Sequence, residues 1–238
     1  MADRPFALIV GVGGATGRAV CERFGASHRL AMVARSRDVT EELAARLPEA
    51  RAYASDVSDA AHWAATLTEI EAEFGKPDRI LFNVERAAWG DYNELDLEVL
   101  ADSFGVNVLG LMVLVRTLYP SRAAITKPCR LLVSSSPAAY GSAPLFLGTA
   151  PSRAAQRVVA ETLHAMLSEH GLSLGVLSIA GMIDEPGMRS VYPDAPDEAF
   201  IRPEAIAERV FDLFAADAFP ERSEITKDGS DAQAEAPS

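Results

Sequence analysis

Apolar residues along this chain form short runs that recur at regular intervals. Residues 6–10 are continuously apolar and end at a glycine cluster, which is typical of a strand buried on both faces of a parallel sheet. Similar runs follow at residues 30–33, 51–54, 79–82, 131–133 and 174–179. The pattern predicts six strands of one parallel sheet.

Segments with helical periodicity lie between these strands. Asp59 precedes one of them and is placed to accept a hydrogen bond from its first amides. Apolar side chains recur every three or four residues in two such segments, at Val39, Leu43 and Leu47 and at Trp63, Leu67, Ile70 and Phe74.

The alternation of strands and helices predicts the fold class. It is an α/β fold, a single Rossmann-type doubly wound parallel sheet with helices on both faces and with ligands at the carboxyl ends of the strands. The 238 residues suit one large domain, but the chain turns polar from Ser223 and its end lacks core-forming residues. We therefore expect a single Rossmann-type domain over residues 1–230 and a disordered acidic tail over residues 231–238.

Two later segments are more apolar than a helix that merely covers a sheet. Residues 97–115 and 154–167 each carry a broad apolar stripe, and the first has apolar residues on its other faces as well. Such a helix is either buried inside its own subunit or covered by a partner. We expect these two segments to form the interface of a homodimer or homotetramer.

The charge of the chain argues against several classes of partner. Its 22 Lys and Arg residues against 34 Asp and Glu residues give a net charge of −12. This charge repels nucleic acids and anionic membrane surfaces. The longest apolar run, residues 106–115, is too short to span a bilayer. We expect a small-molecule substrate, or none, as the partner, with no nucleic acid and no membrane.

The cysteines and the N-terminus indicate a reducing compartment. Cys21 and Cys129 form neither a disulfide framework nor a metal-type spacing. Residues 1–10 lack the basic head and long apolar stretch of a signal peptide, so we expect a cytoplasmic protein. Neither metal-ligand spacing nor a paired nucleophile is found for the four histidines, which are His28, His62, His164 and His170.

A glycine-rich loop directly follows the first predicted strand and precedes a helical segment. Glycines let the backbone turn tightly and approach a pyrophosphate, and the helix N-terminus supplies N–H donors and a positive dipole. In this position the loop predicts a dinucleotide-binding site. The residues expected to bind the cofactor here are Gly11, Gly13, Gly14, Ala15, Thr16 and Gly17.

The end of the second predicted strand indicates which dinucleotide is bound. An acidic residue there would accept hydrogen bonds from a ribose 2′-hydroxyl and select NAD, but none is present. Arg35, Ser36 and Arg37 instead offer donors to a 2′-phosphate. We expect NADP as the cofactor, bound through Arg35 and Ser36.

These features resemble the short-chain dehydrogenase/reductase family, and the resemblance covers residues 6–229. The loop over residues 11–17 is similar to the family's Thr-Gly-x-x-x-Gly-x-Gly. Asp56 and Val57 match the acidic–apolar pair that contacts adenine. Asn83 matches the end of the fourth strand, and Gly181 matches a later Pro-Gly turn. The resemblance implies that these four residues bind the cofactor.

At the catalytic site implied by the resemblance, this chain departs from the family's pattern. In the family a tyrosine donates a proton to the carbonyl, and a lysine four residues on lowers its pKa and holds the nicotinamide ribose. A serine thirteen residues before the tyrosine polarises the carbonyl, and a helix asparagine supports the lysine. Ser136 and Asn107 match the serine and the asparagine. Thr149 and Arg153 stand in place of the Tyr-x-x-x-Lys pair.

This replacement changes the available chemistry. A phenol with a pKa of about 10 can be tuned toward neutrality by a nearby cation, whereas an aliphatic alcohol is a far weaker acid. We therefore expect Thr149 to hydrogen-bond a substrate oxygen without donating its proton. Arg153 stays protonated and is expected to hold ribose hydroxyls and to stabilise developing negative charge.

Two other residues are candidate proton donors. Tyr140, four residues after Ser136, lies in a setting that resembles the epimerase-like branch of the family, so packing or substrate contact is its alternative role. Glu85 follows the fourth strand near the expected nicotinamide position and would need burial to raise its pKa. The alternative for Glu85 is an exposed carboxylate beside Arg86.

Two functional classes follow from these observations. The first is an NADP(H)-dependent oxidoreductase acting on a small carbonyl or alcohol, with Ser136, Arg153 and an unconventional acid or water. The second is a catalytically silent NADP(H)-binding sensor or partner protein of the same fold. In both, residues 182–200 are expected to cover the site and, with Met188 and Tyr192, to make a partly apolar pocket.

Overall fold

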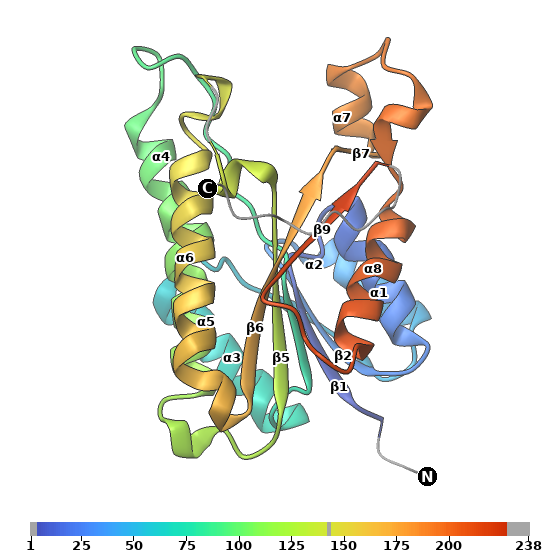
Figure 1. The fold of residues 1–238 in the computed structure, drawn as a ribbon. Coiled ribbons are helices and arrows are strands. Elements are labelled where there is room, and N and C mark those ends of the chain that lie inside the picture. The colour runs from blue at the N-terminus through green and yellow to red at the C-terminus, as the bar shows by residue number, and fades with distance from the viewer. Residues whose placement is uncertain (1–3, 142–143, 228–238) are drawn as a thin grey trace.

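Seven parallel strands form the central sheet of the structure, a computed structural model that describes residues 4–141 and 144–227. The strand order is β3-β2-β1-β4-β5-β6-β9, so the chain reverses its direction of travel between β1 and β4 (Figure 1). The strands of this sheet are β1 (Phe6–Val10), β2 (Arg29–Ala34), β3 (Ala50–Ala54), β4 (Arg79–Phe82), β5 (Cys129–Ser135), β6 (Leu172–Ala180) and β9 (Arg222–Thr226). Doubly wound sheets bind ligands at such a reversal.

Helices cover both faces of the sheet (Figure 1). One face carries α1 (Ala15–Gly25), α2 (Arg37–Arg46) and α8 (Pro203–Ala215). The other carries α3 (Ala60–Phe74), α4 (Leu97–Phe104), α5 (Gly110–Leu118) and α6 (Ala150–Leu167). Beyond the carboxyl ends of the strands, α7 (Pro186–Val191) lies beside a small second sheet of β7 (Met182–Ile183) and β8 (Phe200–Ile201).

The core consists of two apolar layers, one on each side of the sheet. Along β1, Phe6, Leu8 and Val10 belong to the layer under α3 and α5, whereas Ala7 and Ile9 belong to the layer under α1 and α8. Alternate residues of a strand point to opposite faces, so a continuously apolar strand is needed where both faces are covered. The doubly wound fold predicted from the sequence is confirmed.

The six predicted strands are all present, with bounds that differ by up to two residues. The sequence analysis missed β9, which lies in the segment interpreted as polar. Among the described residues this edge strand pairs with β6 alone, and within the strand only Ser223 and Ile225 are buried. The predicted cap of α3 is confirmed, because Asp59 accepts a hydrogen bond from the backbone amide of His62 at 3.0 Å. The predicted tail, residues 231–238, lies outside the described residues.

The most apolar helical stretch runs from Leu97 to Leu118 through α4, a π-helical turn (Gly105–Leu109) and α5. Its 22 residues and hydropathy of 1.7 are enough, by length and composition alone, to cross a membrane. Leu111 and Leu114 of this stretch lie in the core beneath the sheet, as in a core helix of a globular domain. The sequence analysis had considered only residues 106–115 and found that run too short.

Candidate functional site

A cavity of about 1150 Å³ lies at the carboxyl ends of the central strands. It is lined by Val10 at the end of β1, Asn83 after β4, Ser135 at the end of β5 and Ile179 near the end of β6. Pockets for drug-sized ligands are typically about 300–1,000 Å³. This cavity therefore has room for a dinucleotide together with a small substrate.

The glycine loop shapes one end of the cavity. Gly11 has a φ of +94°, and a Cβ there would lie 2.1 Å from the carbonyl oxygen of Asn83. A Cβ on Gly17 would lie 2.4 Å from the carbonyl oxygen of Gly11, so these two glycines allow close packing of loop, strand and helix. Gly11, Gly13 and Gly14 line the cavity, whereas Gly17, which was expected to bind the cofactor, does not, and a Cβ on Gly13 would meet no atom within 4 Å.

The first turn of α1 presents donors to the same end of the cavity. Ala15 and Thr16 line it, and the N-cap residue Gly14 offers no side chain to the helix amides. The Thr16 hydroxyl is buried and, among the described residues, has no hydrogen-bond partner. Helix N-termini of this kind bind anions through their amides and their dipole.

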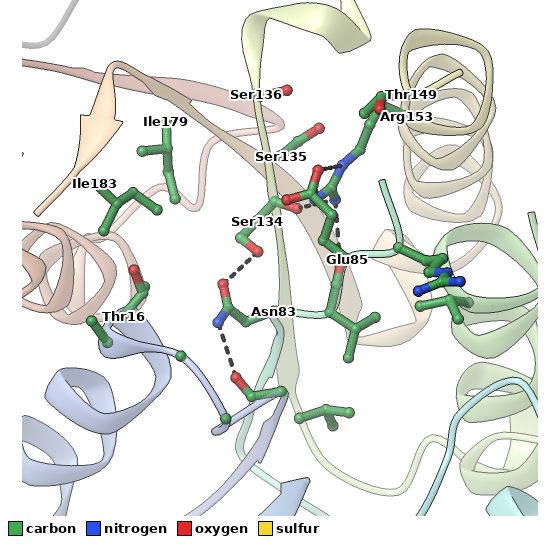
Figure 2. Close-up of a pocket in the computed structure, with 18 of the residues that line it drawn as sticks. Thr16, Asn83, Glu85, Ser134, Ser135, Ser136, Thr149, Arg153, Ile179 and Ile183 are labelled. Atoms are coloured by element: carbon green, nitrogen blue, oxygen red, sulfur yellow. Dashed lines mark hydrogen bonds and ion pairs between the residues drawn. The ribbon is translucent and has the colours of Figure 1, made fainter. Parts of the chain in front are cut away.

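The Asn83 side chain connects the glycine loop after β1 with the end of β5 at the floor of the cavity. Its side-chain amide donates to the carbonyl oxygen of Gly11 at 3.1 Å and accepts a 2.7 Å hydrogen bond from the Ser134 hydroxyl (Figure 2). Asn83 therefore fixes the glycine loop against the end of β5. The prediction that Asn83 lies at the cofactor site agrees with its place in the cavity wall.

Arg35, Asp56 and Val57 lie together at the end of the cavity that is formed by β2 and the β3–α3 loop. The Ser58 hydroxyl donates to Asp56 at 2.7 Å and the Ser58 amide donates at 2.9 Å. These hydrogen bonds, with a contribution from the charge of Arg35, hold the pKa of Asp56 below its usual value. Arg35 is exposed and lies at the same end of the cavity as Asp56.

The two neighbours of Arg35 have other partners. Ser36 is the N-cap of α2, and its hydroxyl accepts a 3.3 Å hydrogen bond from the amide of Asp38. Arg37 forms an exposed ion pair with Glu41 at 3.8 Å. Neither Ser36 nor Arg37 is among the cavity-lining residues, whereas Arg35 is.

Arg153 is 4% exposed and is surrounded by acceptors at the opposite end of the cavity. Its guanidinium donates to the carbonyl oxygen of Ser134 at 3.0 Å and to the side chain of Gln156 at 2.9 Å. It also forms a 3.0 Å ion pair with Glu85 (Figure 2). The sequence analysis left two roles open for Glu85, a proton donor with a pKa raised by burial or an exposed carboxylate beside Arg86. The structure pairs Glu85 with Arg153, 68 positions away. The Glu85 side chain is 47% exposed.

Thr149 lies directly before α6 and lines the cavity, but its hydroxyl is engaged. It donates to the carbonyl oxygen of Ala88 at 3.2 Å, and the residue is 2% exposed. Its position agrees with the sequence analysis. The expected hydrogen bond to a substrate oxygen would require the hydroxyl to leave Ala88.

Asn107 is fully buried in the π-helical turn and does not reach the cavity. Its side-chain amide donates to the Ser152 hydroxyl at 3.0 Å, and its backbone carbonyl oxygen accepts a 2.7 Å hydrogen bond from the Gln156 side chain. Gln156 in turn accepts from Arg153, so Asn107 supports Arg153 through one intermediate side chain.

Three consecutive serines form the cavity wall at the end of β5 (Figure 2). Ser134 is engaged with Asn83, as described above. The Ser135 hydroxyl is buried and has no hydrogen-bond partner within the described residues. Ser136, the residue expected to polarise a carbonyl, is partly exposed and lines the cavity.

Tyr140 is not brought to the cavity. Its ring lies under two guanidinium groups, with Arg157 at 5.1 Å and Arg222 at 5.8 Å from the ring centroid. Its hydroxyl is buried without a hydrogen-bond partner among the described residues, and burial raises the pKa of Tyr140 above its usual value. This position supports a packing role.

Tyr140→Phe is therefore expected to change any carbonyl-reduction rate by less than about twofold, whereas loss of a general acid costs about 10²–10⁴-fold. The free energy of unfolding should stay within about 0.5 kcal/mol, because the lost hydroxyl has no partner and the ring is kept. Thermal unfolding and initial rates of the variant test this. A rate loss of tenfold or more would assign the proton to Tyr140.

Two exposed aromatic residues of the cavity, Trp89 and Phe146, had no signal in the sequence, and their ring centroids lie 5.8 Å apart. Ile183 and Glu185 also line the cavity, and both belong to the segment 182–200 that was expected to cover the site. Met188 and Tyr192 of the predicted covering segment also line the cavity, as expected. Gly181 lies where the chain leaves β6 and lines it too. No groups of three or more metal-ligating side chains occur within the part of the chain that the structure describes.

A doubly wound sheet with a glycine loop, a helix N-terminus and a cavity at the strand reversal defines a nucleotide-binding α/β protein. Residues 5–194 match the short chain dehydrogenase family, and the chain belongs to this family. The comparison with curated proteins gave no match.

Solved structures of the family share this fold. An alcohol dehydrogenase from the archaeon Thermococcus sibiricus, complexed with 5-hydroxy-NADP, is 22% identical with a TM-score of 0.82, over 98% of this chain and 99% of that chain. A 3-ketoacyl-(acyl-carrier-protein) reductase from Brucella melitensis, complexed with NADH, is 21% identical with a TM-score of 0.83, over 94% and 98%. A gluconate 5-dehydrogenase from Burkholderia cenocepacia, in complex with NADP and tartrate, is 16% identical with a TM-score of 0.81, over 94% and 93%.

Proposed function

We propose that this protein is an oxidoreductase that binds NADP(H) in the cavity and exchanges hydride with a small carbonyl or alcohol substrate. The observation that carries the proposal is the pair of anion-binding features along one cavity: the amides at the start of α1, and Arg35 at the end of β2. Helix amides suit a diphosphate, and an arginine suits a 2′-phosphate.

Different cavity residues would bind different parts of the cofactor. Gly13, Gly14 and Ala15 would hold the diphosphate, and Arg35 the 2′-phosphate. The nicotinamide would lie toward Ser136. When bound, the nicotinamide supplies or accepts the hydride. NADP(H) was bound in some of the similar structures and NADH in another, so the choice of NADP rests on Arg35.

Proton transfer to the substrate oxygen is the slow step of the proposed reaction. The chain lacks the Tyr-x-x-x-Lys pair, and Thr149 and Arg153 in its place are already hydrogen-bonded within the protein. Ser136 would donate a hydrogen bond to the substrate oxygen, and Arg153 would stabilise negative charge there. The proton would come from water, because neither residue is an acid near neutrality.

A second candidate function is a catalytically silent NADP(H)-binding sensor or partner protein. It is favoured by one observation, the internal engagement of both Thr149 and Arg153. In that case the cofactor site would be kept and turnover would be absent.

Titration with NADPH and NADH, followed by a screen of carbonyl compounds, tests the proposal and separates the two candidates. The oxidoreductase predicts saturable NADPH binding and slow, substrate-dependent NADPH oxidation. The sensor predicts the same binding with no oxidation. Absence of saturable binding for both dinucleotides would contradict both candidates.

We further propose a homodimer or homotetramer in the cytoplasm, with no nucleic-acid or membrane partner. Large apolar side chains are exposed on the two helices expected at the interface: Leu97 is 73%, Leu109 60%, Val158 49% and Met166 51% exposed. Light scattering at micromolar concentration is expected to give at least twice the 25.4 kDa mass of one chain. A mass of one chain would refute this assembly.

A further inference from the structure

A carboxylate from a distant segment lies on the N-terminal end of α1. Glu185 Oε2 accepts a hydrogen bond from the amide of Ala15 at 3.5 Å, although the two residues are 170 positions apart. The same oxygen lies 3.7 Å from the position that a Cβ on Gly14 would take. Glu185 therefore occupies the end of the cavity at which the glycine loop presents its amides.

The backbone on both sides of Glu185 places its carboxylate there. The amide of Glu185 donates to the carbonyl oxygen of Ile183 at 2.9 Å, and the amide of Asp184 donates to Ile201 at 2.9 Å. The second of these bonds belongs to the small β7–β8 sheet, and Glu185 is the N-cap residue of α7. These bonds position the backbone of Glu185, from which its side chain reaches the Ala15 amide.

Electrostatics favour this contact. The neighbouring cation, Arg189, is committed to Asp184 at 2.8 Å and to Asp197 at 2.6 Å. Among the described residues, the hydrogen-bond partner of the Glu185 carboxylate is the amide of Ala15. The first turn of α1 has no acidic residue of its own, so Glu185 supplies the negative charge that a helix N-terminus attracts.

The same site holds a donor that Glu185 does not use. Thr16 is 5% exposed and lines the cavity near Ile183 (Figure 2), and its buried hydroxyl has no partner among the described residues. Buried hydroxyls are rarely left without a partner. An anion larger than one carboxylate, with oxygens for both Ala15 and Thr16, would satisfy the site.

We propose that Glu185 is an internal competitor for the diphosphate site, and that its carboxylate must leave α1 before a dinucleotide can bind. The inference rests on the proposed binding of NADP(H) in this cavity. A carboxylate and a diphosphate repel each other and require the same amide. The apparent affinity for the dinucleotide is therefore reduced by the fraction of molecules in which Glu185 occupies the site.

Displacement of Glu185 also affects the substrate side of the cavity. Glu185 begins α7, and Met188 on α7 and Tyr192 directly after it both line the cavity. Glu185 therefore links the diphosphate end of the cavity to the segment that carries these two lining residues.

The test compares Glu185→Gln, which removes the charge and keeps the shape, with Glu198→Gln. Glu198 is exposed in the same segment and makes the matched change in net charge away from the cavity. Calorimetric titrations use NADPH and, as a probe that carries the adenosine and the diphosphate without the 2′-phosphate and the nicotinamide, ADP. Glu185→Ala is a second variant, and circular dichroism checks that each variant is folded.

Glu185→Gln and Glu185→Ala are expected to bind both ligands at least about tenfold more tightly than the unmutated protein, with less than about a twofold change for Glu198→Gln. Unchanged or weaker binding by the Glu185 variants would overturn the inference and leave the proposed function standing. Tighter ADP binding without NADPH binding would support the inference and overturn the proposed cofactor. Failure of every variant to bind either ligand would overturn both.

Discussion

Replacing Thr149 by tyrosine together with Arg153 by lysine is expected to raise the rate of carbonyl reduction by about 10²–10⁴-fold, the usual contribution of a general acid. Thr149 lines the cavity, and the prediction requires a phenol at this position to turn into the cavity and away from Ala88, to which the threonine hydroxyl now donates. The lysine is required because an unactivated tyrosine keeps a pKa near 10. Initial rates of NADPH oxidation measure the effect.

The Glu85 carboxylate is expected to limit the gain in rate of the double variant. A lysine at position 153 would meet the carboxylate that now lies 3.0 Å from Arg153, and this pairing would weaken its effect on the new tyrosine. Adding Glu85→Ala to the double variant is therefore expected to raise the rate further. Thr149→Tyr alone is the matched control, with an expected gain of less than about tenfold.

An ordinary enzymatic rate in the unmutated protein would contradict this account of the site. So would a double variant that folds, binds NADPH and shows no gain with any carbonyl that the unmutated protein reduces. In the first case the proton donor would be a group that we have not identified.

Arg35→Asp is expected to abolish or reverse the preference for NADP(H), a preference that we expect to be at least about tenfold in the unmutated protein, or about 1.4 kcal/mol. A charge-assisted hydrogen bond to the 2′-phosphate is lost, and the new carboxylate repels the phosphate but accepts from a ribose 2′-hydroxyl. Together the two effects are expected to change the ratio of affinities by about a hundredfold.

Arg37→Asp is the control for this variant. The substitution makes the same change in charge two residues away from Arg35. Arg37 itself pairs with Glu41 and does not line the cavity. Its effect on the NADPH-to-NADH affinity ratio should stay below about threefold. Equal affinities for NADPH and NADH in the unmutated protein, measured by titration, would show that Arg35 does not read the 2′-phosphate.

The fold was predictable because its strongest signals are local. A strand covered on both faces needs every residue to be apolar, as in Phe6–Val10, and a glycine loop after it needs Gly11 and Gly17 at close contacts. The edge strand β9 was missed because an edge position relaxes this demand. Only alternate residues are buried there, and one of them is the hydroxyl residue Ser223.

The sequence predicted which residues lie at the site better than it predicted the contacts that these residues make. Thr149, Arg153 and Ser136 do lie in the cavity, because each follows a strand or begins a helix at the same edge of the sheet. The partners of Arg153 and of Ala15 were not visible in the sequence. Glu85 and Glu185 reach them across 68 and 170 positions, and no local pattern encodes such pairs.

The central claim is that NADP(H) binds in the cavity, and the most direct test is a crystal structure determined from crystals grown with NADPH. Our account predicts the diphosphate on the amides of Ala15 and Gly14, the 2′-phosphate on Arg35, the nicotinamide beside Ser136, and Glu185 turned away from α1. An empty cavity at saturating NADPH, or a bound dinucleotide whose 2′-phosphate lies away from Arg35, would contradict it.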